Sequence, residues 1–480
     1  MVIALDVGTS SARATLYDAA GRPVPGRFHQ IPYAPALTPD GGVEHDPSRL
    51  LDAVAACLDG VTAGPPADVR GVGVTTFWHG LLGFDAAGRP ATPAYTWADT
   101  RSHAEVQRLR ETLDEDALHA RTGCHLHASY WPAKLRWLQR RSPEEALRVA
   151  RWGSVGELLE LAFFGEAGTS VSMASGTGLL DQTTSAWDPQ AVAAAAIEPK
   201  HLFPLCDRTE GRRGLRAPWA GRWPGLARVP WFPAVGDGAA SNVGSGCVDP
   251  ARVALNVGTS AALRIVTDAP APAPPPRGLW RYRLDRRRAM LGGATSEGGN
   301  VYAWCRAVLR LGDDDLEAAL ARLPADGHGL TVLPHLAGER APGWRGDRTG
   351  AIAGLRLDTT ALEIARAALE AVALRLALVY ALLAPRAAPG HAIVASGAGL
   401  ARSRVWTQIL ADALGRPVTW SHEVEATSRG AALLALEALR LTPELGVAEG
   451  GLGETFLSHS GRHARYREAL ERQRRLDDRV

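Results

Sequence analysis

Lysine is almost absent from this chain. Lys134 and Lys200 are the only lysines among 480 residues, so arginine supplies nearly all of the positive charge. Neither lysine follows a glycine, which excludes the phosphate-binding loop Gly-x-x-x-x-Gly-Lys-Ser/Thr of P-loop kinases. The His-Arg-Asp and Asp-Phe-Gly motifs of protein kinases are absent as well. If the protein binds phosphate groups, it must therefore do so with a loop of another kind.

A strong net charge is also lacking. The formal charge is +2 at pH 7, so the composition favours neither a nucleic acid nor an anionic membrane as a partner. The longest apolar stretch, residues 367–384, contains Glu370 and Arg375. Charges at these positions predict a buried helix of a globular protein, not a membrane span.

Cysteine is scarce, and its spacing is unpaired. The five cysteines predict a cytoplasmic protein in a reducing compartment, without a disulfide framework. The segment Cys124-His125-Leu126-His127 has no second Cys/His cluster that would complete a tetrahedral zinc site. Met1 leads directly into an apolar strand pattern, so no signal peptide is expected.

The length and the alternation of strand and helix patterns predict an α/β protein of two domains. We expect an N-terminal domain over residues 1–243, a C-terminal domain over residues 244–445, and a tail over residues 446–480 that ends in an exposed helix at 462–475. In the second half, Thr359 is expected to cap a long helix that ends at Leu383.

Two nearly identical segments are the most informative pattern. Residues 4–10 read Ala-Leu-Asp-Val-Gly-Thr-Ser, and residues 254–260 read Ala-Leu-Asn-Val-Gly-Thr-Ser. Each predicts a strand, a glycine turn and a return strand, with hydroxyls and free backbone N–H groups directed at one point, as in a phosphate cradle. Two such cradles indicate a duplicated fold that holds one polyphosphate from both sides. The candidate phosphate ligands are Thr9, Ser10, Arg13, Gly258 and Thr259.

The two copies differ in one residue, because Asp6 in the first corresponds to Asn256 in the second. A carboxylate oxygen suits Mg²⁺, so Asp6 is the candidate metal ligand. A third carboxylate position, Asp237, lies between two glycines at a predicted strand end. It can serve as a general base for a substrate hydroxyl, or as the N-cap of the following helix; the two roles are compatible.

Small residues mark a candidate nucleotide site. Gly397, Ala398 and Gly399 follow an apolar strand, and Gly299 opens a predicted helix. A flat base can lie against such backbone, although a single glycine-rich turn is a weak signal.

Aromatic and charged residues after two strands form a candidate sugar site. Trp78 and His79 follow one strand, and Trp97, Asp99 and Arg101 follow a loop. Rings, a carboxylate and a guanidinium suit a polyhydroxylated ligand. The alternative is that the tryptophans belong to the core and that Asp99 and Arg101 form a structural pair.

These motifs in this order resemble the FGGY family of carbohydrate kinases, within the superfamily of actin, hexokinase and Hsp70-type ATPases. The matching segments are residues 6–13, 236–238, 256–260, 333–342 and 396–412. The resemblance implies two ribonuclease-H-like domains with the active site in the cleft between them.

The resemblance also implies roles for single residues. Asp237 would be the general base, and Asp6 would help to hold Mg²⁺ beside ATP. Gly299, Gly399 and Ser403 would flank the nucleotide. The family contacts its sugar at the positions of His79, Asp99 and Arg101. A homodimer would follow the habit of the family.

Residues 43–47, 96–102, 121–134 and 172–179 resemble the gluconate kinase branch, which implies D-gluconate as the acceptor. Residues 77–78, 125–130 and 425–430 depart from that branch. Xylulose or ribulose are therefore alternative acceptors. The alternatives from another class are an actin- or chaperone-like nucleotide-gated ATPase and a non-catalytic sugar sensor.

Overall fold

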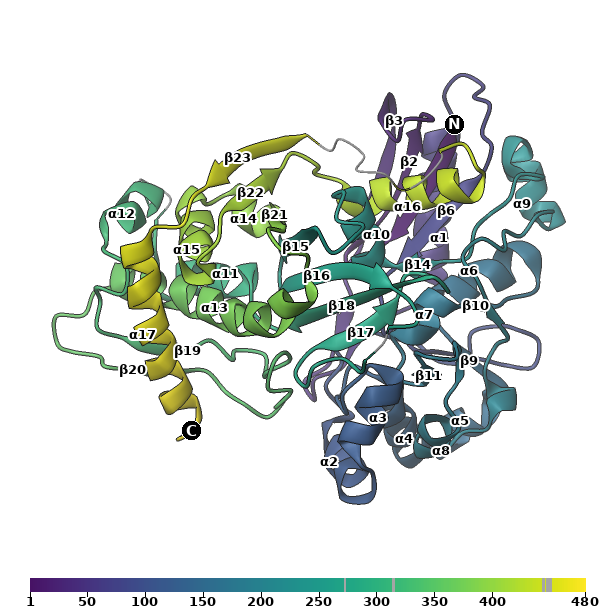
Figure 1. The fold of residues 1–480 in the computed structure, drawn as a ribbon. Helices are drawn as coiled ribbons and strands as arrows, with labels where there is room; N and C mark the ends of the chain where they lie inside the picture. The colour runs from purple at the N-terminus through teal and green to yellow at the C-terminus, as the bar shows by residue number, and fades with distance from the viewer. Residues whose placement is uncertain (272, 313–315, 443–444, 446–450) are drawn as a thin grey trace.

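Two mixed β-sheets, each with helices packed against it, make up the computed structural model (Figure 1). It describes residues 1–480 except 272, 313–315, 443–444 and 446–450. The first sheet has the strand order β14-β6-β1-β2-β3, and the second has the order β17-β18-β16-β15-β21-β22-β23.

The first sheet is formed by the N-terminal half of the chain. Its strands are β1 (Val2–Val7), β2 (Ser11–Tyr17), β3 (Pro23–Pro32), β6 (Val72–Thr76) and β14 (Val235–Gly236). Strands β1, β2 and β3 are antiparallel, whereas β6 is parallel to β1 and β14 is parallel to β6. Helices α1 (Pro47–Thr62) and α6 (Val155–Phe164) pack against this sheet.

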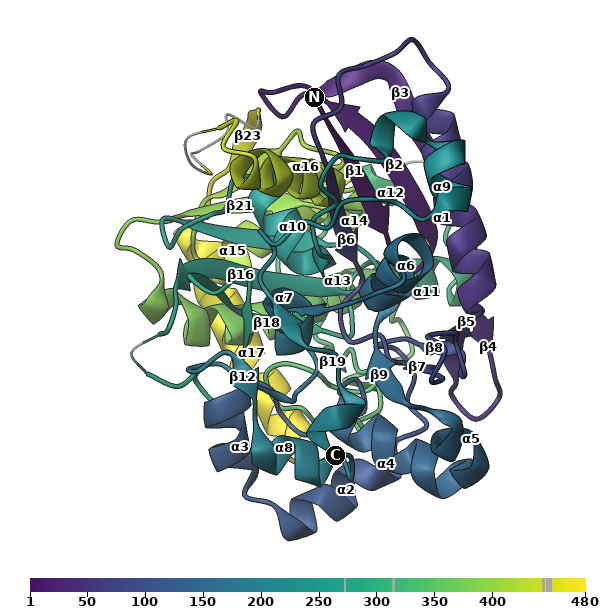
Figure 2. The same cartoon turned by 90° about the vertical axis from the view of Figure 1, so that its right-hand side faces the viewer.

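The other elements of this half form smaller units. Helices α2–α5 and α8 gather at the lower end of both views (Figures 1 and 2). The helices are α2 (His103–Thr112), α3 (Glu115–Thr122), α4 (Trp131–Arg141), α5 (Pro143–Arg148), α7 (Val171–Ser175), α8 (Pro189–Ala194) and α9 (Ala217–Arg222). The short strands are β4 (Ala36–Leu37), β5 (Val43–His45), β7 (Leu82–Phe84), β8 (Ala94–Tyr95), β9 (Arg151–Gly153), β10 (Thr169–Ser170), β11 (Leu180–Asp181), β12 (Ala186–Trp187) and β13 (Leu205–Cys206).

The second sheet repeats the topology of the first. Its strands are β15 (Arg252–Val257), β16 (Ala261–Asp268), β17 (Trp280–Arg283), β18 (Arg288–Thr295), β21 (Ala392–Ser396), β22 (Val418–Ser421) and β23 (Leu452–Phe456). Strands β15, β16 and β18 are antiparallel, β21 is parallel to β15, and β22 is parallel to β21. The order β18-β16-β15-β21-β22 therefore matches β3-β2-β1-β6-β14, which is the duplication that the repeated segments predict.

Helices of the second half cover this sheet and connect it to the first. They are α10 (Asp237–Gly244), α11 (Gly299–Val308), α12 (Leu316–Arg322), α13 (Ala361–Leu383), α14 (Ala398–Ala401), α15 (Arg404–Leu414), α16 (Ala426–Ala438) and α17 (Ser460–Asp477); β19 (Thr331–Leu333) and β20 (Ala351–Ala353) form a separate pair. Helix α16 follows β22 but packs on α10 and on strands β1 and β6 of the first sheet. In Figure 2 it lies on the opposite side of that sheet from α1.

Helix α13 is the long apolar helix that the sequence predicts. With the 3₁₀ turn after it, the segment Ala361–Arg386 is long and apolar enough to cross a membrane, but 67% of its most apolar window is buried inside the protein. It packs against β16, β18 and α15, which confirms the prediction of a buried core helix. The predicted cap was one residue early: Thr360, not Thr359, accepts the hydrogen bond from the Glu363 backbone N–H.

The C-terminal segment differs from the expected exposed tail. Part of the predicted tail lies outside the described residues, but β23 pairs with β22 at the edge of the second sheet. On α17, the Gln473 amide donates to the Val332 carbonyl at 2.9 Å, and Asp477 accepts from Arg375 at 3.1 Å. The predicted terminal helix is present and most of its residues are exposed, but one face, with Tyr466, Ala469, Gln473 and Asp477, is buried against other elements. The domain boundaries expected after residues 243 and 445 stay predictions.

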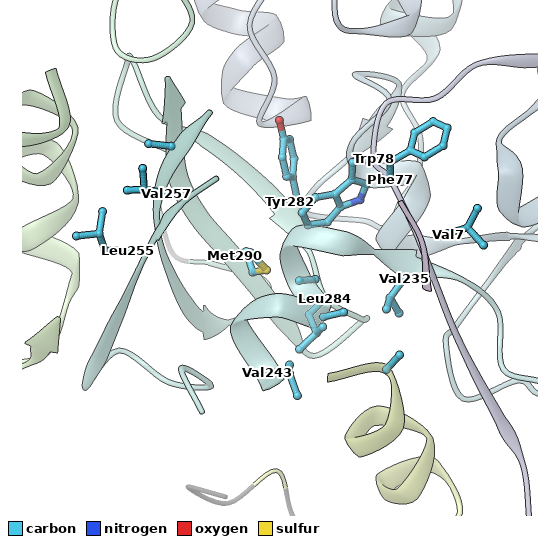
Figure 3. Packing of buried hydrophobic residues seen from close by; sticks show 14 of the residues in the cluster. Val7, Phe77, Trp78, Val235, Val243, Leu255, Val257, Tyr282, Leu284 and Met290 are labelled. Carbon is cyan, nitrogen blue, oxygen red and sulfur yellow. The ribbon is translucent and has the colours of Figure 1, made fainter. Parts of the chain in front are cut away.

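One apolar cluster extends from the first sheet to the second. Figure 3 shows Val7, Trp78 and Val235 on one side and Leu255 and Tyr282 on the other, with Trp78 beside Tyr282. The two rings are 4.9 Å apart between centroids. The halves therefore share a core next to the cavity described below.

Candidate active site

The two hairpins face one cavity of about 240 Å³. The β1–β2 turn is closed by the Gly8 N–H donating to the Ser11 carbonyl, and the β15–β16 turn by the Gly258 N–H donating to the Ser260 carbonyl, each at 2.9 Å. Thr9 from the first hairpin and Thr259 from the second line the cavity, together with Asp237. The structure thus brings three of the predicted residues to one place.

Asp237 is delivered to the cavity by the end of β14 and is the first residue of α10. Gly236, not Asp237, occupies the N-cap position, so the side chain is not used as a helix cap. Its Oδ1 accepts from the Gly238 N–H at 2.7 Å. Burial raises the pKa of Asp237, and the nearby Arg264 guanidinium partly opposes that rise. A carboxylate with a raised pKa is a stronger base once it is deprotonated.

Asp6 lies at the end of β1 and is 2% exposed. Burial raises the pKa of this carboxyl to about 7; the Arg13 cation lowers it and the Asp237 charge raises it further. Arg13 is the cross-strand neighbour of Asp6 and donates to Asp6 Oδ2 at 3.1 Å. Its Nε also lies 3.7 Å from Glu425, so Arg13 neutralises carboxylates and does not line the cavity. Ser10 is exposed at the hairpin tip.

A larger pocket of about 940 Å³ adjoins this cavity, because Gly258 and Thr259 line both. Gly299, Ala398 and Gly399 line it as well, as the sequence predicts. The backbone is tightly packed there, since the Gly299 N–H donates to the Gly258 carbonyl at 2.7 Å. A flat ring can approach this glycine-lined wall closely.

Two of the predicted nucleotide residues have structural roles instead. Gly397 does not line the pocket and takes φ +106° beneath the Val257 carbonyl. Ser403 is 2% exposed and accepts from the Trp406 backbone N–H as the cap of α15. Three further residues that the motifs did not indicate line this pocket from α11 and from the turn after α14: Tyr302, Arg306 and Arg402.

The other end of the smaller cavity is aromatic. Trp78, His79 and Trp97 line it, as predicted, and Trp280 and Tyr282 of β17 join them. Burial lowers the pKa of His79 to about 3, so the ring is neutral. Its Nδ1 lies 2.5 Å from the Gly176 carbonyl, an acceptor, so Nδ1 carries the proton and Nε2 is an acceptor.

Asp99 and Arg101 are not among the described residues that line this cavity. Arg101 Nε donates to both Asp99 oxygens at 3.1 Å, its guanidinium bonds Glu44 at 2.6 Å, and it stacks 4.6 Å from the Trp137 ring. The structure therefore favours the alternative of a structural ion pair. The charge and spacing of Asp99 and Arg101 are the same for a sugar-binding pair and for a structural ion pair, so the sequence could not distinguish these two roles.

Two arginines in the cavity were missed as candidates. Arg264 lies on β16, and Arg340 lies within the segment 333–342 that resembles the family signature. A charged residue inside the otherwise apolar strand Ala261–Val266 was the available signal for Arg264.

Duplicated ribonuclease-H-like domains of the actin/hexokinase type, with two glycine-containing hairpins and a carboxylate at a shared cavity, are typical of an ATP-dependent phosphotransferase. Family models identify the kind: residues 1–244 match the N-terminal domain, and residues 253–439 the C-terminal domain, of the FGGY family of carbohydrate kinases. The chain belongs to this family and is an ATP-dependent carbohydrate kinase.

Its relatives act on different acceptors. A gluconokinase of Bacillus licheniformis is 29% identical and is aligned over 99% of this chain and 94% of its own. A glycerol kinase of Aromatoleum aromaticum is 33% identical over 90% and 89% of the two chains. A ligand-bound xylulose kinase structure from Lactobacillus acidophilus superposes with a TM-score of 0.92 at 26% identity, covering 99% of this chain and 97% of that one. The family is thus shared by kinases of sugars, polyols and sugar acids.

Proposed function

We propose that this kinase transfers the γ-phosphoryl group of ATP to a primary hydroxyl of D-gluconate, giving 6-phosphogluconate. The observation that supports a kinase reaction is the single cavity shared by Thr9, Thr259 and Asp237. Similarity to a gluconokinase over nearly the full length of both chains supports gluconate as the acceptor.

Asp237 is the proposed general base. It accepts the proton of the acceptor hydroxyl as that oxygen attacks the γ-phosphorus in line and the bond to the β-phosphate oxygen breaks. Thr9, Ser10, Gly258 and Thr259 hold the phosphates through hydroxyls and backbone N–H groups. Arg13 acts on them only through Asp6, which it partly neutralises.

Asp6 is the proposed ligand of Mg²⁺. Its carboxylate is buried, has Arg13 as its hydrogen-bonding cation and carries a raised pKa, so a further positive charge at this oxygen would stabilise the ionised form. Carboxylate oxygens also suit this ion. Bound Mg²⁺ would neutralise charge on the β- and γ-phosphates.

The adenosine of ATP is proposed to lie in the larger pocket, against Gly299, Ala398 and Gly399. The acceptor is proposed to lie in the smaller cavity, with Trp78 and Trp97 against its carbon chain and His79 Nε2 accepting from a hydroxyl. Closure of the two halves over bound substrates would exclude water from the reacting centre, which would limit wasteful hydrolysis of ATP.

We place the enzyme in the cytoplasm. All five cysteines are free and buried, in keeping with a reducing compartment. A homodimer stays a prediction from the family resemblance.

The test is ATP consumption by the purified protein with gluconate, xylulose, ribulose, glycerol, erythritol and rhamnulose. We expect the highest kcat/KM with gluconate, and a product phosphorylated at O6 by ³¹P NMR. A preference for xylulose or ribulose would refute gluconate as the acceptor, but it would leave the assignment as a kinase unchanged. A lack of response to every acceptor would favour a nucleotide-gated ATPase or a sugar sensor.

A further inference from the structure

Two arginines that line the smaller cavity, the half-buried Arg264 and the buried Arg340, have no hydrogen-bonding or ion-pair partner among the described residues. The Nε atoms of Arg264 and Arg340 are buried without a hydrogen bond. Within the part of the chain that the structure describes, no side-chain hydrogen bond or ion pair involves either guanidinium. By contrast, the buried Arg208, Arg283 and Arg375 all bond to carboxylates or carbonyls. A buried cation without a partner is costly, so its retention calls for a function.

The two guanidiniums enter the cavity from different segments. Arg264 projects from β16 over α10: a Cβ added to Gly238 would lie 3.4 Å from the Arg264 Cζ. Arg340 is 8% exposed, and its Cζ lies 5.3 Å from the centre of the Trp97 ring. Each cation lowers the pKa of Asp237, and Arg340 also lowers the pKa of Arg264, so all three charges are mutually close.

The charges of the cavity wall do not balance. Asp237 is the one carboxylate among the described lining residues, against two guanidiniums, and His79 is neutral. The other lining side chains at this end are the rings of Trp78, Trp97, Trp280 and Tyr282. Before ATP binds, a neutral polyol would leave one positive charge of the cavity wall uncompensated, whereas an acceptor with one negative charge would compensate it.

We propose that Arg264 and Arg340 bind the carboxylate of the acceptor, which makes this enzyme a kinase of sugar acids. The inference deepens the proposed function and rests on its acceptor occupying this cavity. Guanidinium groups match carboxylates with paired N–H donors, so the subsite selects for the acid over a neutral analogue of the same shape.

The test compares D-gluconate with D-gluconamide, which keeps the carbon chain and every hydroxyl but replaces the carboxylate by a neutral amide. Wild-type enzyme should show a kcat/KM for gluconate at least about 100-fold higher than for gluconamide, as the loss of a buried charge pair implies. Arg264→Gln and Arg340→Gln should each lose most of the activity on gluconate, largely through KM, and lose clearly less on gluconamide. Because each guanidinium lowers the pKa of Asp237, a loss in kcat that is common to both acceptors reports on the base, and the additional loss on gluconate reports on the subsite. Arg70→Gln, on the exposed surface, is the control.

Isothermal titration of gluconate into the protein without nucleotide gives a second readout. Both glutamine variants should bind gluconate at least about tenfold more weakly, and Arg340→Lys should recover part of the binding of R340Q because it retains the charge. Circular dichroism at 222 nm establishes that each variant is folded.

The outcomes separate this inference from the proposed function. Equal losses on gluconate and gluconamide would mean that the arginines serve ATP, and would overturn the subsite. Equal wild-type use of the two acceptors would overturn it as well. Turnover of another sugar acid but not of gluconate would retain the subsite and refute the gluconate assignment. Turnover of neutral ketoses alone would refute both the carboxylate subsite and the gluconate assignment, but the protein would still be a carbohydrate kinase.

Discussion

Two carboxylates with different surroundings, the buried Asp6 and the half-buried Asp237, are the residues proposed to carry the chemistry. Asp6 is held by a cross-strand arginine, whereas Asp237 is held by a backbone N–H and lies near two unpaired arginines. Both pKa values are raised by burial, and each is influenced by cations. Their different neighbours are consistent with one carboxylate serving the metal and the other the acceptor hydroxyl.

Replacing Asp237 by Asn should remove the base and leave the fold. We expect kcat to fall about 100- to 10,000-fold, because general-base catalysis contributes that much, while ATP binding and the melting temperature stay near the parent values. In the parent enzyme, activity should fall as pH drops through the raised pKa of Asp237, since the protonated carboxyl cannot accept a proton. Turnover within tenfold of the parent would refute the role of the base.

Replacing Asp6 by Asn should weaken the use of Mg²⁺–ATP. It should also change how stability depends on pH. The ordinary pKa of 3.8 is raised to about 7 in the fold, so protonation favours folding at low pH and this contribution is lost as pH rises through 7. Between pH 5 and 8 the ligand-free parent should lose on the order of 2 kcal/mol of stability relative to D6N.

Differential scanning calorimetry of the ligand-free proteins at several pH values measures this difference. Asp68→Asn, at an exposed position, is the control and should run parallel to the parent. Parallel curves for D6N and the parent would contradict the burial argument. An unchanged Mg²⁺ dependence of kcat would contradict the metal role.

At the scale of elements, the site depends on the crossing of α10 and α16. Gly430 of α16 lies against α10 so closely that an added Cβ would be 1.8 Å from the Ala240 carbonyl oxygen. Arg429 of α16 also donates to the Gly244 carbonyl at 2.7 Å. Because α10 begins at Asp237, this crossing positions the proposed base.

Gly430→Ala should therefore cost about 1–3 kcal/mol or more in unfolding free energy and reduce kcat, because overpacking shifts α10. Gly221→Ala is the matched control: this glycine also lies in a helix, α9, but an added Cβ meets nothing within 4 Å. The control should be neutral or slightly stabilising, owing to the better helix propensity of alanine. Chemical denaturation measures both, and equal effects would contradict the role of the crossing.

At the scale of the molecule, the two halves meet directly beside the proposed acceptor cavity. The Tyr130 and Tyr282 hydroxyls are 2.5 Å apart, and the Arg281 N–H donates to the Gly123 carbonyl at 2.9 Å. Gly123 takes φ +70° at the end of α3, and an added Cβ would lie 2.2 Å from the Arg281 carbonyl oxygen. The halves can approach this closely only if the position is glycine.

Gly123→Ala should hold the halves apart. We expect a higher KM for the acceptor, by about tenfold, and more ATP hydrolysis without acceptor, because water reaches the reacting centre. Gly165→Ala is the control, since it has a similar φ of +82° at the end of α6 and only ordinary contact with Arg216. It carries the same backbone strain without the second half as a neighbour. If both variants behave alike, backbone strain and not separation of the halves is the cause.

Local sequence by itself determined the repeated hairpins, the two-domain α/β class and the placement of Thr9, Asp237 and Thr259 at one cavity. Glycine turns and strand patterns act over a few residues, so they can be read along the chain. The resemblance of these motifs to those of known proteins then predicted that the chain belongs to the FGGY family. The glycine wall of the nucleotide pocket followed from the same short-range signals, apart from Gly397 and Ser403.

Only the tertiary structure decided which side chains meet across long sequence separations. It joins Arg101, the partner of Asp99, to Glu44, packs α17 onto the second half, and brings Arg264 and Arg340 to the proposed acceptor cavity. The physical reason is that a charged side chain takes its partner from whatever packing brings near. The sequence around an arginine in a strand is the same whether its guanidinium binds a carboxylate of the protein or, as we propose for Arg264, the carboxylate of a substrate.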